Sequence, residues 1–304
     1  MKNAPILSEF RKDKTMKIDV KGHSGCSVDI VREGSGLYIK KSTSSTGYFS
    51  RLIAQARKQQ AASRRYRSSL VKVPEILDIS RTRDRVSVKM NYIYSMNFVE
   101  YFEYSGFYRI SHFIDMLKSF LMEEVALSPM TCIGRGVLVD KFKDVRTKCI
   151  SNPLINGDDE IAFLLERSAR IFMENKDDFT IPVGVCHGDL TFSNILFSNG
   201  DYYLIDFLDS FVESPLMDIV KVRQDTAFGW SLLMYGRLYD EIRLKIIFEK
   251  IDIALDDCFS QYEWYQRYYP VFQLMNFLRI LQYAKDSRVV EYLKTVMKRL
   301  TDEF

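Results

Sequence analysis

The spacing of hydrophobic and polar residues divides the chain into a strand-rich first third and a mostly helical remainder. Short alternating or β-branched runs, separated by glycine-bearing turns, predict strands at 17–20, 28–31, 37–41, 71–77 and 85–90. Residues 48–66 contain no Gly or Pro and predict a helix between these strands. From Asn97 onward the pattern is mostly helical, most clearly at 107–127, 160–174 and 218–304.

A polar loop followed by a hairpin signal stands out in VGVCHGDLTFSNILFSNGDYYLIDF, residues 183–207. Asn199-Gly200 lies between two short β-type runs and predicts a two-residue loop, because both positions of a type I′ turn need a positive φ. This loop fixes the predicted facing pairs as Ser198 with Asp201, Asn194 with Ile205, and Ser193 with Asp206.

Candidate chemistry follows from that register. Asn194 and Asp206 then lie on neighbouring strands with Cα atoms about 5–7 Å apart. An amide oxygen and a carboxylate at this separation can share one Mg²⁺, a cation that takes oxygen ligands and keeps several waters. Asp189 lies five residues before Asn194 and can reach the same space as a base.

Composition and charge narrow the class of protein. With 304 residues, 47% of them hydrophobic and 13% aromatic, the chain can build a real core in one large domain or two lobes. The net charge of +3 gives no reason to expect a nucleic-acid partner. The five cysteines form no CxxC pair and indicate reduced thiols rather than a disulfide framework or a zinc site. Without an apolar signal segment or a run of about 18 apolar residues, we expect a soluble, cytoplasmic protein.

The segment HGDLTFSN, followed by LIDF, resembles the catalytic loop and metal-binding segment of the aminoglycoside phosphotransferase and choline kinase family. This family has the protein-kinase-like fold, so the resemblance implies an α+β, bilobal chain. The small, β-rich N-lobe would comprise residues 1–92, and the larger, mostly helical C-lobe residues 93–304. The resemblance further implies a base at Asp189, Mg²⁺ ligands at Asn194 and Asp206, and residues supporting the catalytic loop at His187 and Asp218.

The N-terminal strands would bind the nucleotide in this fold. The loop 22–27 is expected to lie over the ATP phosphates, through Gly22, Ser24, Gly25 and Ser27. In the strand YIKK, Lys40 is expected to hold the phosphates, with Lys41 as the alternative on the opposite face. Met90 would line the adenine pocket, and the Asn91 carbonyl and Ile93 N–H would meet the adenine edge.

Two features depart from the pattern or leave alternatives open. Kinases pair the strand lysine with a Glu on the following helix, and residues 48–66 contain no Glu. Either Gln55 or Gln59 replaces it by hydrogen bonding, or the lysine is held differently. Asp209 either contacts a metal-bound water or the acceptor, or is simply a turn carboxylate.

The resemblance implies an ATP-dependent kinase that phosphorylates a hydroxyl of an amino alcohol, sugar, aminoglycoside or amino acid. Acceptor contacts would come from the helical region, with candidates at Trp230, Trp264, Gln273, Asn276 and Arg279. An atypical protein kinase is one alternative, although Pro215 follows Asp206 after nine residues and leaves no room for a long activation loop. A nucleotide-binding pseudokinase with an interaction role is another, suggested by the missing Glu. The sequence indicates neither the oligomeric state nor ATP over GTP.

Overall fold

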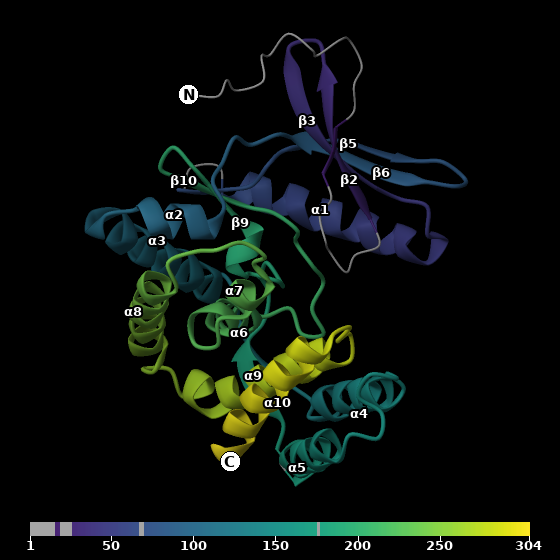
Figure 1. Cartoon of the computed structure of the whole chain (residues 1–304), viewed down its shortest axis with the longest axis vertical. Coiled ribbons are helices and arrows are strands. Elements are labelled where there is room, and N and C mark those ends of the chain that lie inside the picture. The colour runs from purple at the N-terminus through teal and green to yellow at the C-terminus, as the bar shows by residue number, and fades with distance from the viewer. Residues whose placement is uncertain (1–15, 19–25, 67–69, 175–176) are drawn as a thin grey trace. The chain divides into compact units, whose positions relative to one another are not determined.

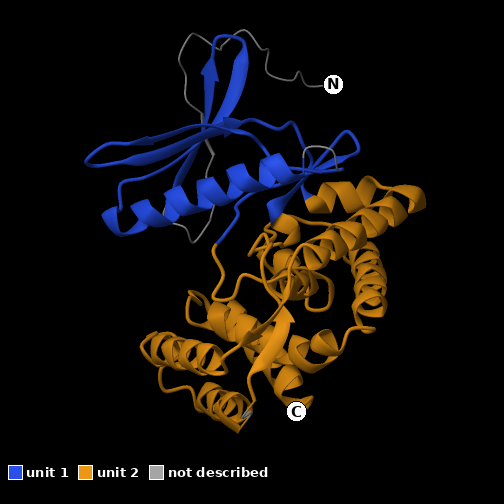
Figure 2. Cartoon of the chain, turned by 180° about the vertical axis from the view of Figure 1, so that it is seen from behind, with its two compact units in different colours: residues 1–97, 194–208 blue, residues 98–193, 209–304 orange. Residues whose placement is uncertain are grey.

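The computed structural model describes residues 16–18, 26–66, 70–174 and 177–304 (Figure 1). The chain forms two compact units, one of residues 1–97 and 194–208 and the other of residues 98–193 and 209–304 (Figure 2). The predicted hairpin therefore belongs to the same unit as the N-terminal strands. The division into a nucleotide-binding lobe at 1–92 and a catalytic lobe at 93–304 stays a prediction.

The first unit is built on a five-stranded antiparallel sheet in the order β1-β2-β3-β6-β5. Its strands are β1 (Met16–Ile18), β2 (Ser27–Glu33), β3 (Gly36–Thr43), β5 (Ile76–Arg81) and β6 (Val86–Asn91). The short helix η2 (Thr46–Tyr48) leads into α1 (Phe49–Arg65), which lies against this sheet (Figure 1). Leu52 and Ala56 of α1 pack against Val88 and Met90, and Ile39 of β3 joins them. The strands predicted at 28–31, 37–41 and 85–90 and the helix predicted at 48–66 are confirmed.

A smaller sheet in the same unit contains the hairpin. It has three strands in the order β4-β10-β9, namely β4 (Val71–Lys72), β9 (Ile195–Ser198) and β10 (Asp201–Leu204). The single strand predicted at 71–77 is wrong, because β4 pairs with β10 while β5 pairs with β6 in the large sheet. Pro74 lies at the break, where a residue without an N–H cannot continue a ladder.

The second unit is mostly helical. Its helices are α2 (Phe98–Tyr104), α3 (Phe107–Ala126), α4 (Gly136–Ile150), α5 (Asp159–Glu174), α6 (Pro215–Thr226), α7 (Trp230–Met234), α8 (Glu241–Phe259), α9 (Glu263–Leu281) and α10 (Ser287–Asp302). The strands β7 (Met130–Ile133) and β8 (Phe179–Pro182) form a two-stranded sheet, and the short helix η3 (Phe192–Asn194) leads back to the first unit. The predicted α+β class, with a β-rich part before a larger helical part, is confirmed.

An aromatic cluster in this unit fixes the end of the candidate catalytic loop. The Phe192 ring lies 5.4 Å from Phe102 and 5.0 Å from Phe248, measured between centroids, and Phe98 and Phe113 complete the group. Aromatic pairs at these distances add to the stability that burial alone provides. Phe192 is therefore a fixed anchor two residues before Asn194. In the described ranges, no helix combines the length and apolar character that a membrane span requires.

Candidate active site

A carboxylate on α6 holds the first residues of the candidate catalytic loop in place. Asp218 is fully buried, and its two oxygens accept hydrogen bonds from the backbone N–H groups of His187 and Gly188, the latter at 2.7 Å. Gly188 has φ = 89°, a left-handed conformation that favours glycine. The His187 ring is also buried, and its Nδ1 accepts the Asp189 N–H at 3.2 Å. These contacts have the bracing geometry that the sequence suggests for His187 and Asp218.

A second carboxylate of α6 holds the other end of the loop. The Asp225 oxygens accept from the N–H of Phe192 at 2.6 Å and from the N–H of Ser231 at 2.9 Å. Burial raises the pKa of Asp225 to about 6, against the opposing effect of these hydrogen bonds. The sequence analysis did not single out Asp225, although it lies seven residues after Asp218 and so on the same helix face.

Asp189, the predicted base, forms an ion pair with Lys221 of α6, with Nζ and Oδ1 3.0 Å apart. Burial by itself would raise the pKa of Asp189. The charge and hydrogen bond of Lys221, helped by His187 and Arg279, instead bring that pKa below its ordinary value. The carboxyl group is therefore ionised at neutral pH. Sequence reasoning missed Lys221, and its position between Asp218 and Asp225 on one helix face was the available signal.

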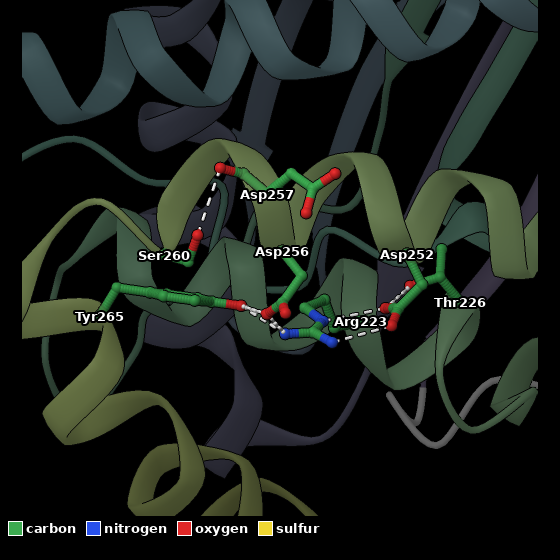
Figure 3. Close-up of polar contacts among 7 residues, drawn as sticks. All are labelled: Arg223, Thr226, Asp252, Asp256, Asp257, Ser260 and Tyr265. Carbon is green, nitrogen blue, oxygen red and sulfur yellow. Dashed lines mark hydrogen bonds and ion pairs between the residues drawn. The ribbon is translucent and has the colours of Figure 1, made fainter.

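Helix α6, which carries these three residues, is itself fixed at its N-terminus and on another face. Ser214 is its N-cap, and the Ser214 hydroxyl accepts the Leu216 N–H. Arg223 forms hydrogen bonds to the two oxygens of Asp252 at 2.9 and 2.8 Å, and to Asp256 at 2.5 Å (Figure 3).

Both aspartates belong to α8, and α9 completes the site around Arg223. The Tyr265 hydroxyl accepts from the guanidinium and donates to Asp256 at 2.8 Å (Figure 3). The Tyr269 ring lies 4.6 Å from the guanidinium carbon. We call Arg223, Asp252, Asp256 and Tyr265 the Arg223 cluster. It ties α6 to α8 and α9, so the face that carries Asp218, Lys221 and Asp225 has a rigid support.

The hairpin in the first unit has the predicted register. Ser198 pairs with Asp201, and the Asn194 carbonyl accepts the Ile205 N–H at 3.1 Å. Asn199 and Gly200 have φ values of 49° and 90°, as the predicted turn requires. The facing of Ser193 and Asp206 stays a prediction.

Asp206 ends this hairpin in a strained conformation. Its φ is 62°, which is uncommon for a residue other than glycine and concentrates at functional sites. Oδ1 lies 2.9 Å from the Nζ of Lys41, and 45% of the Asp206 side chain is exposed. The carboxylate therefore pairs with a buried lysine and keeps an accessible surface.

Lys41, rather than the expected Lys40, is the strand lysine beside Asp206. Lys41 shares a face of β3 with Ile39, which packs against the α1 core, and only 9% of its side chain is exposed. Burial lowers the pKa of Lys41, but the Asp206 carboxylate raises it above its ordinary value. Lys40 lies on the other face, opposite Lys89 of β6. The apolar Ile39 was the sequence signal that marked the covered face.

Gln55 and Gln59, the two candidate partners of the strand lysine on α1, form hydrogen bonds to other groups. Gln59 donates to the Pro74 carbonyl at 2.9 Å and to the Met90 sulfur at 3.7 Å. Gln55 donates to the Tyr48 hydroxyl at 3.2 Å. Within the described ranges neither glutamine hydrogen-bonds to Lys41, so the carboxylate that holds this lysine is Asp206 and not a residue of the helix.

The other predicted nucleotide residues that the structure describes belong to the first unit. Gly22, Ser24 and Gly25 lie outside the described residues. Ser27 is exposed and its hydroxyl lies 2.9 Å from that of Ser42. Met90 is buried in the core beneath α1, and the Asn91 N–H donates to the Glu75 carbonyl at 3.1 Å. Ile93 follows β6 and is partly exposed, while Asp209 is exposed in the second unit.

The residues at the hairpin end fit a magnesium ion by their chemistry. Among the described residues, no three His, Cys, Asp or Glu side chains lie close enough to hold a metal by themselves. Mg²⁺ does not need such a cage, because it uses one or two protein oxygens and completes its shell with water and phosphate. The accessible Asp206 carboxylate and the amide oxygen of Asn194 are donors of this kind.

Comparison with known proteins gives two findings. Residues 151–240 match the family model described as the phosphotransferase enzyme family, and this range contains Asp189, Asn194, Asp206, Asp218 and Lys221. Among curated proteins, no sequence matches the chain.

Solved structures share the fold. The gentamicin complex of APH(2″)-IIa is 14% identical, with 96% of this chain and 91% of that chain covered and a TM-score of 0.50. A glucosamine kinase in complex with glucosamine, ADP and inorganic phosphate is 13% identical, with 95% and 76% covered and a TM-score of 0.51. At this identity the likeness establishes the fold. Together, the family match and the shared fold confirm the resemblance predicted from the sequence: this chain is similar to the phosphotransferase enzyme family and has the kinase-like fold.

Proposed function

We propose that this protein transfers the γ-phosphoryl group of ATP to a hydroxyl group of a small molecule. The observation that carries the proposal is the family match over the one segment that contains Asp189, Asn194 and Asp206. The local geometry supports it. Asp189 is ionised and braced from α6, and Asp206 is strained, accessible and paired with a buried lysine.

Asp189 orients the acceptor hydroxyl and receives its proton as the phosphoryl group is transferred. Phosphoryl transfer depends mainly on positioning and on stabilising charge, so a weakly basic but well-placed carboxylate suffices. His187 and Asp218 keep the loop that carries Asp189 in place through their backbone hydrogen bonds.

Asn194 and Asp206 would hold Mg²⁺, which supplies positive charge to the phosphate oxygens when bound. Lys41 is the lysine that we assign to the phosphates, because it is the one beside Asp206. The backbone of Gly22, Ser24, Gly25 and Ser27 would cover the phosphates, as the sequence suggests. The segment from Met90 to Ile93 would meet the adenine.

The solved structures suggest which acceptor compounds to test first. The similar proteins were crystallised with gentamicin and with glucosamine, both small molecules. Amino sugars and aminoglycosides therefore head the panel, followed by free sugars, amino alcohols and amino acids.

The proposal is tested by incubating the protein with γ-labelled Mg·ATP and this panel, with a protein substrate included as a separate arm. We expect a labelled small product from the wild type and none from Asp189→Asn. Asp286→Asn is the matched control, because Asp286 is an exposed N-cap of α10 in the same unit. Label found only on the protein substrate, or equal labelling by Asp189→Asn, would overturn the proposal.

A further inference from the structure

Lys221 is a charged side chain inside the second unit that the motif does not account for. It lies on α6, with only 12% of the side chain exposed, and its Nζ is 3.0 Å from Oδ1 of Asp189. An ion removed from water to this extent is unfavourable unless it is paired and hydrogen-bonded. The pairing therefore places the lysine at the residue that we propose as the base.

A chain of hydrogen bonds from α9 fixes the lysine. The Gln224 Oε1 accepts from Lys221 Nζ at 3.3 Å and from the Asn276 Nδ2 at 2.7 Å. Gln224 and Asn276 are both buried. The Arg223 cluster holds the same turn of α6 to α8 and α9 (Figure 3). Lys221 thus approaches Asp189 from a rigid element, which is the arrangement that keeps a functional group in one geometry.

The groups that lower the pKa of Asp189 are all basic side chains. Lys221 approaches from α6, His187 from the loop itself and Arg279 from α9, and each favours the ionised carboxylate. Lys221 also favours the ionised form of Asp225 on its own helix. Lys221 is the first of these partners in strength, since it alone contributes both the largest favourable charge and a hydrogen bond.

The consequence for the reaction is specific. Without a cationic partner, a buried carboxylate binds its proton more tightly, and a neutral carboxyl group cannot accept the proton of an alcohol. We propose that Lys221 is a positioning residue for the base: it holds the Asp189 carboxylate ionised and oriented toward the acceptor hydroxyl. This inference rests on the proposed function for its effect on turnover, but the effect on Asp189 itself is independent of any substrate.

The test compares Lys221→Met, Lys221→Arg and the wild type, with Lys245→Met as the matched control. Methionine keeps the length and removes the charge, while arginine keeps the charge. Lys245 is an exposed lysine of α8 in the same unit. The titration of the Asp189 carboxyl carbon is followed by NMR on protein labelled at aspartate, and Asp189→Asn assigns the resonance.

We expect the Asp189 pKa to rise in Lys221→Met and to stay near the wild-type value in Lys221→Arg and Lys245→Met. In the transfer assay, the acidic limb of the kcat profile should move to higher pH in Lys221→Met. Its kcat at neutral pH should fall about tenfold or more, with most of the loss recovered by arginine. A lower melting temperature with an unmoved acidic limb would mean that Lys221 is only structural and would overturn the inference.

The two proposals fail in different ways. An unchanged Asp189 titration in folded Lys221→Met overturns the role of Lys221, whatever the activity of the protein. Conversely, the wild type could transfer phosphate to no member of the panel while the Asp189 pKa differs between the wild type and Lys221→Met. That result counts against the proposed function and supports the pairing of Lys221 with Asp189.

Discussion

The substitution Asp218→Asn tests whether α6 supports the catalytic loop. The Asp218 carboxylate accepts two backbone N–H groups, those of His187 and Gly188, at a site with no solvent exposure. Asparagine keeps one acceptor oxygen and turns an NH₂ group toward the other N–H. One charge-assisted hydrogen bond is then lost and a buried donor is left without a partner, which costs about 3 kcal/mol.

The assay is urea unfolding of the wild type and two variants, with the midpoint and slope fitted separately. Asp218→Asn should lower the free energy of unfolding by about 3 kcal/mol at an unchanged slope, and it should reduce turnover, because Asp189 follows directly on the released loop. The control is Asp286→Asn, where the exposed carboxylate accepts the Val289 N–H and asparagine caps equally well, so the free energy of unfolding should change by no more than about 0.5 kcal/mol. An Asp218→Asn variant as stable as this control would refute the bracing role.

Three further predictions concern the same elements. Burial raises the pKa of Asp225 from an ordinary 3.8 to about 6 in the folded protein, so between these pH values the folded state binds the proton more tightly than the unfolded state. Relative to Asp225→Asn, the wild type should therefore lose about 2 kcal/mol of unfolding free energy as pH rises from 4 to 6. A pH-independent difference in urea unfolding would contradict this. Arg223→Met should lower the free energy of unfolding by about 3 kcal/mol, because Asp252 and Asp256 lose their cationic partner. Arg267→Met removes an exposed ion pair and should change the free energy of unfolding by less than about 1 kcal/mol, and equal effects of the two substitutions would refute the structural role of the Arg223 cluster. Lys41→Met should reduce kcat/KM about 100-fold in the transfer assay, while Lys40→Met should stay within about threefold of the wild type. The reverse order would mean that Lys40, and not Lys41, binds the phosphates.

Local patterns predicted the parts of the fold that depend on local rules. The Asn199-Gly200 turn has the φ values and the Ser198–Asp201 register expected of it, because a two-residue loop permits few backbone conformations. The α1 helix forms where a run without Gly or Pro predicts one. In contrast, the chain around Pro74 divides between two sheets, and sheet membership depends on long-range pairing that a strand pattern does not reveal.

The site was harder to predict where a residue acts through distant packing. Alternation showed that Lys40 and Lys41 point to opposite faces of β3, but the choice between them depended on which face α1 covers. Lys221 and Asp225 are named by no motif, because their role comes from the approach of α6 to a loop some 30 residues earlier in the sequence. The sequence contained their helical spacing from Asp218, and only the fold shows what that face contacts.

The most direct test of the central claim measures ATP binding and ATP turnover in the same preparations. The wild type, Asp189→Asn and Asp206→Asn are compared with Mg²⁺ present and after its removal by a chelator. The account predicts that Asp189→Asn binds Mg·ATP like the wild type but does not turn it over, and that Asp206→Asn loses the Mg²⁺-dependent part of binding together with turnover. Wild-type turnover by folded Asp189→Asn, or turnover that is unaffected by the chelator, would contradict it.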